Sequence, residues 1–325
     1  MFISTLKCFA SQLPGIKALL QERDELTAQV IEQRKSLSIW RKGFVHPGHY
    51  YSPIPDLGQV KGRHSQIFKR SLKDIPGIDL NTREQLNLLE VFASYYGDMP
   101  FPEESSSGFR YHLNNDFYAY SDGICLYSML RHLKPRRFIE VGSGFSSAAT
   151  LDTRDRFLNR EMELTFIEPY PERLEGLLAR DDKNSENQTI IRSIVQDVSL
   201  DTFSALQSGD ILFIDSTHVS RVGSDVNYLL FEVIAALNPG VYIHIHDIFF
   251  PFEYPENWIY GGRAWNELYL LRAFLQYNRD FEIVFFNSYL HMAFHDLIAE
   301  KMPLCLSKPK SEHTIPGSIW LRKLR

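Results

Sequence analysis

The sequence predicts an α/β protein whose main body is a doubly wound sheet of seven mainly parallel strands, preceded by an N-terminal helix and a small irregular cap. Three observations support this prediction. After residue 116, apolar runs of strand length recur, and helix-length stretches separate most of them, as right-handed crossovers require. A helical apolar pattern fills residues 16–40. Residues 43–76 are rich in Pro, Gly, Tyr and His, a composition typical of turns and extended segments.

Residues 1–42 are assigned to the N-terminal amphipathic helix. A heptad numbered from residue 16 has apolar residues at six of its eight a and d positions, which are Ile16, Leu19, Arg23, Leu26, Val30, Gln33, Leu37 and Trp40. This seam fits a short coiled coil that joins subunits into a homo-oligomer. It also fits a helix that lies on its own domain, because about three heptads are near the lower limit for a coiled coil.

Residues 43–115 form the predicted cap or connector. A helix is expected from Thr82 to Tyr96, with Asn81 as its N-cap, because Asn is a preferred residue at that position. The stretch "GDMPFPEESSSG" then interrupts the helical pattern. The main domain is therefore expected to occupy residues 116–325.

In the main domain, Ser121 or Asp122 is expected to cap a helix that contains "GICLYSMLRHL". The expected strands are "RRFIEVGSG", "ELTFIEP", "TIIRSIVQD", "DILFIDS", "VYIHIHD", "FEIVFFN" and "GSIWLRK". In sheets of this class the ligand site lies beyond the carboxyl ends of the strands, at the point where the strand order reverses. The polar residues that close the strands are therefore the candidate site residues.

Composition excludes several classes of partner. The chain has 325 residues, a net charge of -5 and a pI near 6.1, so no overall basic field is available to hold nucleic acid. Its three cysteines are far apart and lack the CxxC spacing of zinc sites, which favours a reducing compartment. The N-terminus is interrupted by Lys7, Gln12 and Pro14, and no apolar run is long enough to span a membrane. We expect a cytoplasmic protein without a membrane partner.

The first strand closes in a glycine turn. Gly142 and Gly144 let the backbone approach a ligand closely, and Ser146 and Ser147 begin a helix whose free N–H groups favour an anionic group. Such a turn fits NAD, FAD or S-adenosylmethionine, and it also occurs as a purely structural turn. Glu140 sharpens the prediction, because a dinucleotide-binding fold usually has an apolar residue at that place.

The next two strands also end in acids. Glu168 follows the second strand, where a carboxylate can accept hydrogen bonds from both hydroxyls of a ribose, and Asp197 closes the third, near an adenine edge. Each acid alone is better explained as a solvated loop carboxylate. Three acidic strand ends beside a glycine turn predict a cofactor site.

These residues together resemble a known family. Glu140-x-Gly142-x-Gly144, Glu168, Asp197 and "DILFIDSTH" resemble the class I S-adenosylmethionine-dependent methyltransferases, in the methyltransferase domain 24-like branch with the late pattern "IDGSH...D...L.PGG...HD". The corresponding stretch here is "IDSTHVSRVGSDVNYLLFEVIAALNPGVYIHIHD", and the resemblance covers residues 116–325. Ser146 replaces the third glycine of the family turn, and Val241 replaces the second glycine of the PGG turn.

The resemblance implies a Rossmann-like fold and S-adenosyl-L-methionine as the cofactor. Glu140 and the turn of Gly142, Gly144 and Ser146 would hold the methionine end. Glu168 would hold the ribose, and Asp197 the adenine amino group. The departure at Ser146 concerns the cofactor contacts and leaves the expected fold unchanged.

The strand "VYIHIHD" contains His244, His246 and Asp247 where a buried parallel strand is normally apolar throughout. If it pairs with "DILFIDS", Asp215 and Asp247 end neighbouring strands about 4.8 Å apart. Two carboxylates that close repel each other unless a proton or a cation lies between them.

A divalent cation such as Mg²⁺ would resolve this repulsion, with His218 or His246 completing its ligands. We take Asp215, Asp247 and His218 as the candidate metal ligands. Metal-dependent O-methyltransferases of the catechol type are similar here, although their Asn after the second acid is Ile248 in this chain. In the alternative, the histidines bond to backbone or to Asp225 and only brace the loop.

The predicted function is S-adenosylmethionine-dependent O-methylation of a small molecule or sugar. Asp215, His218, His246 and Asp247 are the candidate catalytic residues, with a histidine as proton acceptor. The aromatic segment 248–267 and "HPGHYYSPIPD" are candidate walls of the substrate site. Three alternatives are a metal-dependent hydroxylase-like enzyme on the same fold, a nicotinamide-dependent oxidoreductase, and a non-catalytic cofactor-binding module that assembles through the N-terminal helix.

Overall fold

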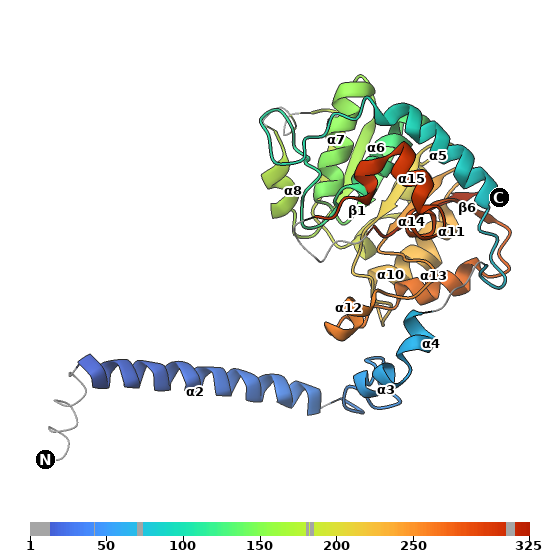
Figure 1. Cartoon of the computed structure of the whole chain (residues 1–325). Coiled ribbons are helices and arrows are strands. Elements are labelled where there is room, and N and C mark those ends of the chain that lie inside the picture. The colour runs from blue at the N-terminus through green and yellow to red at the C-terminus, as the bar shows by residue number, and fades with distance from the viewer. Residues whose placement is uncertain (1–13, 42, 70–73, 180–181, 183–184, 310–315) are drawn as a thin grey trace, which may run out of the picture. The chain divides into compact units, whose positions relative to one another are not determined.

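The computed structural model describes residues 14–41, 43–69, 74–179, 182, 185–309 and 316–325 (Figure 1). Side chains are not described for Pro14 and residues 36–41, and Cys8 lies outside the described residues. The chain divides into two compact units, Met1–His64 and Ser65–Arg325. The division into segments 1–42, 43–115 and 116–325 remains a prediction.

The first unit contains the expected long helix, α2 (Pro14–Arg41), and the short α3 (Leu57–Gly62). The side chain of Asp56 caps α3 by accepting hydrogen bonds from two backbone N–H groups of its first turn. On α2, apolar side chains of the predicted seam are exposed, among them Leu19 at 65% and Leu26 at 53%. The seam positions Leu37 and Trp40 have side chains outside the described residues.

The second unit is built on a seven-stranded sheet, and all seven predicted strands are present. Their order across the sheet is β3-β2-β1-β4-β5-β7-β6. The strands are β1 (Arg137–Val141), β2 (Glu163–Ile167), β3 (Gln188–Ile191), β4 (Ile211–Ile214), β5 (Tyr242–His246), β6 (Phe281–Phe286) and β7 (Ser318–Lys323). The first five pair in parallel, and β7 lies antiparallel between β5 and β6. The predicted Rossmann-like doubly wound fold is confirmed.

The strand order reverses between β1 and β4. Strand β1 pairs with β2 on one side and with β4 on the other, so the chain leaves β1 in one direction and returns on the opposite side. Strand β4 is buried at all four positions, as expected for a central parallel strand. This reversal is where a doubly wound sheet opens a crevice for a ligand.

Helices cover the sheet and connect its strands. In the second unit α5, α6 and α7 pack side by side (Figure 1). The helices that begin after residue 63 are α4 (His64–Phe68), α5 (Thr82–Tyr96), α6 (Ser121–Leu133), α7 (Phe145–Phe157), α8 (Glu172–Leu177), α9 (Leu200–Ser204), α10 (Asp225–Tyr228), α11 (Ile234–Ala236), α12 (Glu256–Tyr260), α13 (Glu267–Leu275), α14 (Asn287–Ala293) and α15 (His295–Lys301). In the part of the chain that the structure describes, no helix is both long and apolar enough to cross a membrane.

Two helix starts lack the side-chain capping hydrogen bonds that the sequence predicted. Asn81 does precede α5, but its backbone is left-handed and its side-chain amide donates to the carbonyl of Ile283, 3.1 Å away, instead of capping the helix. Ser121 and Asp122 lie inside α6 and are buried. Asp122 accepts hydrogen bonds from Asn287 at 2.8 Å and from Ser318. The Ser121 hydroxyl is hydrogen-bonded to His291 Nε2 at 2.7 Å, so both residues serve tertiary contacts.

An arginine ties the segment before α6 to the body of the second unit. Arg110 forms ion pairs with Asp152 at 2.7 Å, Asp155 at 2.8 Å and Asp182 at 2.6 Å. Its side chain is 11% exposed, so these pairs are little screened by solvent. Part of the predicted connector is thereby fixed against α7.

Glu140 lies in the middle of the sheet and joins β1 to α7. Its carboxylate is fully buried and accepts hydrogen bonds from the hydroxyl groups of Ser146 and Ser147, the latter at 2.7 Å. Burial raises the pKa of Glu140 to about 8, although the two serines oppose this shift. These bonds hold the turn between β1 and α7 in place from inside the protein.

The buried Glu140 predicts a pH dependence of stability. Its ordinary pKa is 4.5 and its folded pKa is about 8. Between these values the folded state binds a proton that the unfolded chain lacks. The free energy of unfolding therefore decreases as the pH rises, by at most about 1.4 kcal/mol per pH unit. Glu140→Gln should remove this contribution in denaturant unfolding between about pH 5 and 8, whereas Glu161→Gln, at an exposed site, should not. Equal pH slopes for Glu140→Gln and the native chain would contradict the assignment.

Candidate active site

A cavity of about 360 Å³ opens at the carboxyl ends of β1, β2, β4 and β5, as predicted for the reversal point. Most of the residues singled out in the sequence line it, and these are Gly142, Gly144, Ser146, Glu168, Asp215, His218, His246 and Asp247. Glu140 and Asp197, both described, are not among the lining residues. The candidate site is therefore one continuous space rather than several separate loops.

The glycine turn after β1 lies directly against the end of β4. Gly142 has φ +82°, and a Cβ atom there would lie 1.8 Å from the carbonyl oxygen of Asp215. Any side chain at residue 142 would therefore force the two strand ends apart. At Gly144 the backbone is extended, and a Cβ would lie 3.2 Å from the Arg173 side chain.

Glu168 is fixed beside this turn. Its carboxylate accepts hydrogen bonds from the backbone N–H groups of Ser143 at 3.1 Å and Tyr170 at 2.9 Å. The first bond links the end of β2 to the glycine turn after β1. Each carboxylate oxygen accepts one of these bonds and keeps a second acceptor position, and Glu168 lines the cavity.

Asp197 takes a different position from the one expected. Strand β3 ends at Ile191, and Val195–Asp197 form a short 3-10 turn in which Asp197 is exposed. The predicted contact of Asp197 with an adenine amino group remains a prediction. The sequence run "TIIRSIVQD" gave no sign that its last residues leave the strand.

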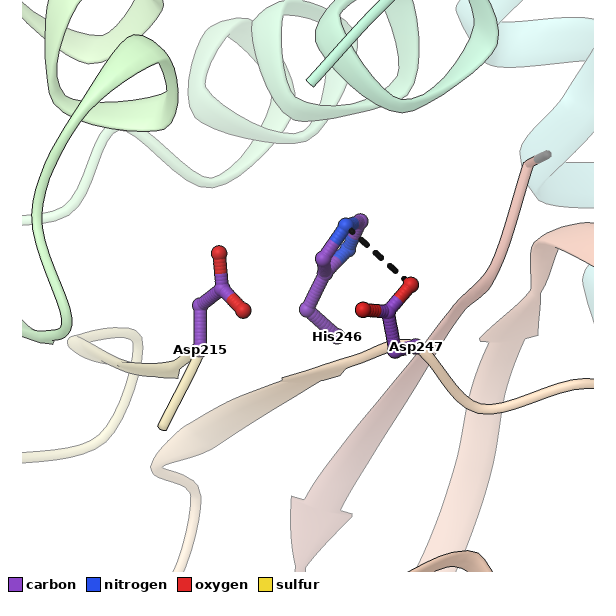
Figure 2. A group of neighbouring side chains, drawn as sticks. All are labelled: Asp215, His246 and Asp247. Atoms are coloured by element: carbon purple, nitrogen blue, oxygen red, sulfur yellow. Dashed lines mark ion pairs between the residues drawn. The ribbon is translucent and has the colours of Figure 1, made fainter. Parts of the chain in front are cut away.

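Three side chains converge where β4 and β5 end (Figure 2). Asp215, His246 and Asp247 each offer one ligand atom, and these atoms all lie within 4.8 Å of one another. His246 Nε2 lies 3.7 Å from Asp247 Oδ1. His246 is 4% exposed, and its Nδ1 has no hydrogen-bond partner among the described residues.

His218 lies against the same two acids. Its Nε2 is 3.3 Å from Asp215 Oδ1 and 3.6 Å from Asp247 Oδ2. Its Nδ1 is 2.9 Å from Glu267 Oε2. The alternative in which Asp225 braces a histidine is wrong for the described contacts, because Asp225 instead accepts hydrogen bonds from Thr217.

Hydrogen bonds and neighbouring charges shift the pKa values of this group. Burial alone would lower the pKa of His218, but its hydrogen bonds to Asp215 and Glu267 outweigh burial and raise that pKa well above its usual value. Burial would also lower the pKa of His246, but the charges of Asp247 and Asp215 raise it. Burial raises the pKa of Asp247. The partly buried Asp215 and Asp247 and the buried Glu267 therefore favour a positive charge among them.

His244 belongs to the core rather than to the site. Its ring stacks on Phe213 at 3.9 Å between centroids and meets Trp320 edge-on at 4.7 Å. Both of its nitrogens are buried without hydrogen-bond partners among the described residues. Burial lowers its pKa well below the usual value, so the ring is neutral.

The backbone is left-handed at two of the clustered residues. His218 has φ +61° and Asp247 has φ +56°, which is uncommon for residues other than glycine. Such conformations cost on the order of 1–3 kcal/mol each and persist only where the surrounding contacts impose them. Both turn a side chain toward the same cavity.

Sequence reasoning did not single out Tyr118 and Arg173, which line the cavity. Trp265 also lines it and belongs to the aromatic segment 248–267, which was predicted as a wall of the substrate site. Glu267 lies in the same segment, but its position behind His218 was not predicted. An acid in the first turn of a helix, such as Glu267, is a common surface feature. Its burial at 2% exposure was therefore not readable from the sequence.

Comparisons with known proteins agree with this architecture. A family model described as a methyltransferase domain matches residues 139–248, which include the glycine turn and the ends of β4 and β5. An uncharacterized protein of Archaeoglobus fulgidus is 37% identical over 168 residues, covering 51% of this chain and 75% of that protein.

Several solved structures are more distantly similar. The S-adenosylhomocysteine-bound methyltransferase PaMTH1 of Podospora anserina is 14% identical, covering 87% of this chain and 100% of its own, with a TM-score of 0.40. The O-methyltransferase TomG of Streptomyces achromogenes, bound to S-adenosylmethionine, is 14% identical over 82% of this chain and 96% of its own, with a TM-score of 0.40. A structure of cmcI with Mg and S-adenosylmethionine is 18% identical, covering 89% of this chain and 100% of its own, with a TM-score of 0.36.

Two features of the chain agree. The order of the seven strands, with β7 antiparallel between β5 and β6, is that of a Rossmann-like sheet. The methyltransferase model covers the strands that form the cavity. The chain therefore belongs to the methyltransferases, through a methyltransferase domain at residues 139–248.

Proposed function

We propose that this chain transfers the methyl group of S-adenosylmethionine to a hydroxyl oxygen of a small molecule or sugar. One observation carries the proposal: the cluster of Asp215, His218, His246 and Asp247 shares a single cavity with the glycine turn and Glu168. A cofactor held by the turn and Glu168 would have its reactive end beside groups that can bind and deprotonate an acceptor.

The cofactor half of the site is assigned to β1 and β2. The turn at Gly142 and Gly144 supplies backbone for the methionine end, with Ser146 at the start of α7 beside it. Glu168 would accept hydrogen bonds from the ribose hydroxyls. Glu140 acts indirectly, since its carboxylate is already engaged by serines of α7.

The acceptor half fits a divalent cation. Asp215 and Asp247 provide carboxylate oxygens, and His246 provides the nitrogen that converges with them. This set differs from the one favoured in the sequence, in which His218 was the third ligand. Oxygen and imidazole donors suit Mg²⁺, Mn²⁺ and related ions. When bound, such an ion would lower the pKa of an acceptor hydroxyl.

A residue of the chain can accept the proton that the acceptor hydroxyl loses. The acceptor oxygen attacks the methyl carbon, the carbon–sulfur bond breaks, and its electron pair remains on sulfur in S-adenosylhomocysteine. His218 Nε2 faces the cavity and would accept the hydroxyl proton. Asp215 and Glu267 raise the pKa of His218. The positive charge of a bound sulfonium would oppose this rise and so allow His218 to act as a proton acceptor.

We also propose that α2 associates with a second copy of the chain. Leu19, Leu26 and Val30 form an exposed apolar seam with heptad spacing. An isolated helix has little stability in water unless its apolar face is packed. The seam therefore fits a coiled coil between subunits.

Loss of the Glu168 carboxylate should weaken cofactor binding. Glu168→Ala is expected to reduce S-adenosylhomocysteine affinity by roughly 1.5–3 kcal/mol, the range for hydrogen bonds to a charged group. Titration calorimetry measures this, with Glu172→Ala on the exposed surface of α8 as the control. Unchanged affinity in a folded Glu168→Ala protein would remove Glu168 from the cofactor site.

Loss of the acid at the end of β5 should weaken the binding of metal and leave the binding of cofactor unchanged. Asp247→Asn suits the left-handed backbone better than alanine does. We expect it to abolish Mn²⁺ binding in calorimetry, while S-adenosylhomocysteine affinity stays within about threefold, under 1 kcal/mol. Methyl transfer to any acceptor found in a metabolite panel should fall by roughly 100-fold. Asp201→Asn is the control. Native protein that binds no Mn²⁺, or full activity in Asp247→Asn, would exclude the metal-assisted role.

Charges placed in the α2 seam should dissociate the assembly. The double substitution Leu19→Lys and Leu26→Lys in the full chain is expected to lower the mass measured by light scattering, because buried lysines are costly at a and d positions. Ile31→Lys is the matched control, since Ile31 is 59% exposed and lies outside the seam. An identical mass for all three proteins would leave α2 as a helix without an assembly role.

A further inference from the structure

Glu267 is a buried acid directed at one candidate catalytic residue. It is the first residue of α13 and is 2% exposed. Its Oε2 lies 2.9 Å from His218 Nδ1, on the side of the ring opposite the cavity acids. A buried carboxylate is costly unless it is paired, and a purely packing role at this position would be met by an apolar side chain.

The start of α13 also holds the backbone of His218. The N–H groups of Asn266 and Glu267 both donate to the carbonyl oxygen of His218, at 3.1 and 3.2 Å. The side chain of Asn266 bonds to both the N–H and the carbonyl of Ser220, at 2.6 and 3.1 Å. These bonds fix the loop after β4 in the conformation that gives His218 its positive φ.

The His218 ring is restrained on a face as well as at its edges. Trp265 lies 4.4 Å from it between ring centroids, tilted by 33°, and also lines the cavity. One ring nitrogen faces Glu267, and the other lies 3.3 Å from Asp215. The contacts around the ring therefore define a single orientation.

We propose that Glu267 is a positioning residue that keeps the proton of His218 on Nδ1, so that Nε2 is the nitrogen presented to the acceptor. An ionised carboxylate can only accept a hydrogen bond, so the nitrogen facing it must carry a proton. In the neutral ring the other nitrogen is then free to take a proton. The role of Glu267 in the reaction rests on the proposed methyl transfer.

The protonation of His218 can be read directly by NMR of the full chain with ¹⁵N-labelled histidine. The His218 signals are assigned by their loss in His218→Asn. Spectra are recorded at a pH high enough for the His218 ring to be neutral. There we expect the ring proton on Nδ1 and none on Nε2 in the native protein and in Glu267→Gln, whose amide oxygen still accepts a hydrogen bond. In Glu267→Met, which has no such acceptor, an unprotonated Nδ1 should appear. Glu253→Gln is the control, because Glu253 bonds to Tyr269 of the same helix.

Two results would overturn the proposal: an unprotonated Nδ1 in the native protein, or the native pattern in Glu267→Met. If Glu267→Met does not fold, the native spectrum alone decides.

With an acceptor from the metabolite panel, kcat should fall 10- to 100-fold in Glu267→Met and recover at least partly in Glu267→Gln. S-adenosylhomocysteine affinity should stay within about threefold. Because the spectra need no turnover, a failure of the positioning role is distinguishable from a failure of the methyl-transfer proposal.

Discussion

The close contact between the end of β1 and the end of β4 determines the rest of the site. The carbonyl oxygen of Asp215 occupies the place where a side chain at Gly142 would begin. The backbone N–H of Asp215 also donates to Val141, so the two strand ends are joined by a hydrogen bond as well as by contact. In the proposed reaction, this contact would bring a cofactor on the glycine turn within reach of an acceptor beside Asp215. The partly buried carboxylates of Asp215 and Asp247 then favour cationic groups, which both the sulfonium and a divalent ion would supply.

Most of the site could be predicted because it follows strand ends. In a parallel sheet the residues just after neighbouring strands meet at one edge, so Glu168, Asp215 and Asp247 were found from chain order alone. Glu267 could not be found in this way. It reaches His218 through the packing of a helix that begins after a long aromatic loop, and no periodic pattern specifies that distance.

The fold was predictable where burial is periodic and less so where the chain turns. All seven strands follow from apolar runs, whereas β3 ends earlier than its run suggests and leaves Asp197 exposed. Asp122 looked like a helix cap because caps and buried hydrogen-bond partners use the same residue types. Its bonds to Asn287 and Ser318 depend on segments distant in the sequence, and local patterns do not contain them.

A crystal structure with S-adenosylhomocysteine and Mn²⁺ tests the central claim most directly. The cofactor sulfur should lie in the cavity between the glycine turn and Asp215. The sulfur lone pair that the methyl group occupies in S-adenosylmethionine should point toward His218 Nε2. Anomalous scattering should place Mn²⁺ among Asp215, His246 and Asp247, at about 2.0–2.6 Å from the carboxylate oxygens. A cofactor bound outside this cavity, or a sulfur directed away from His218, would contradict the proposed methyl transfer.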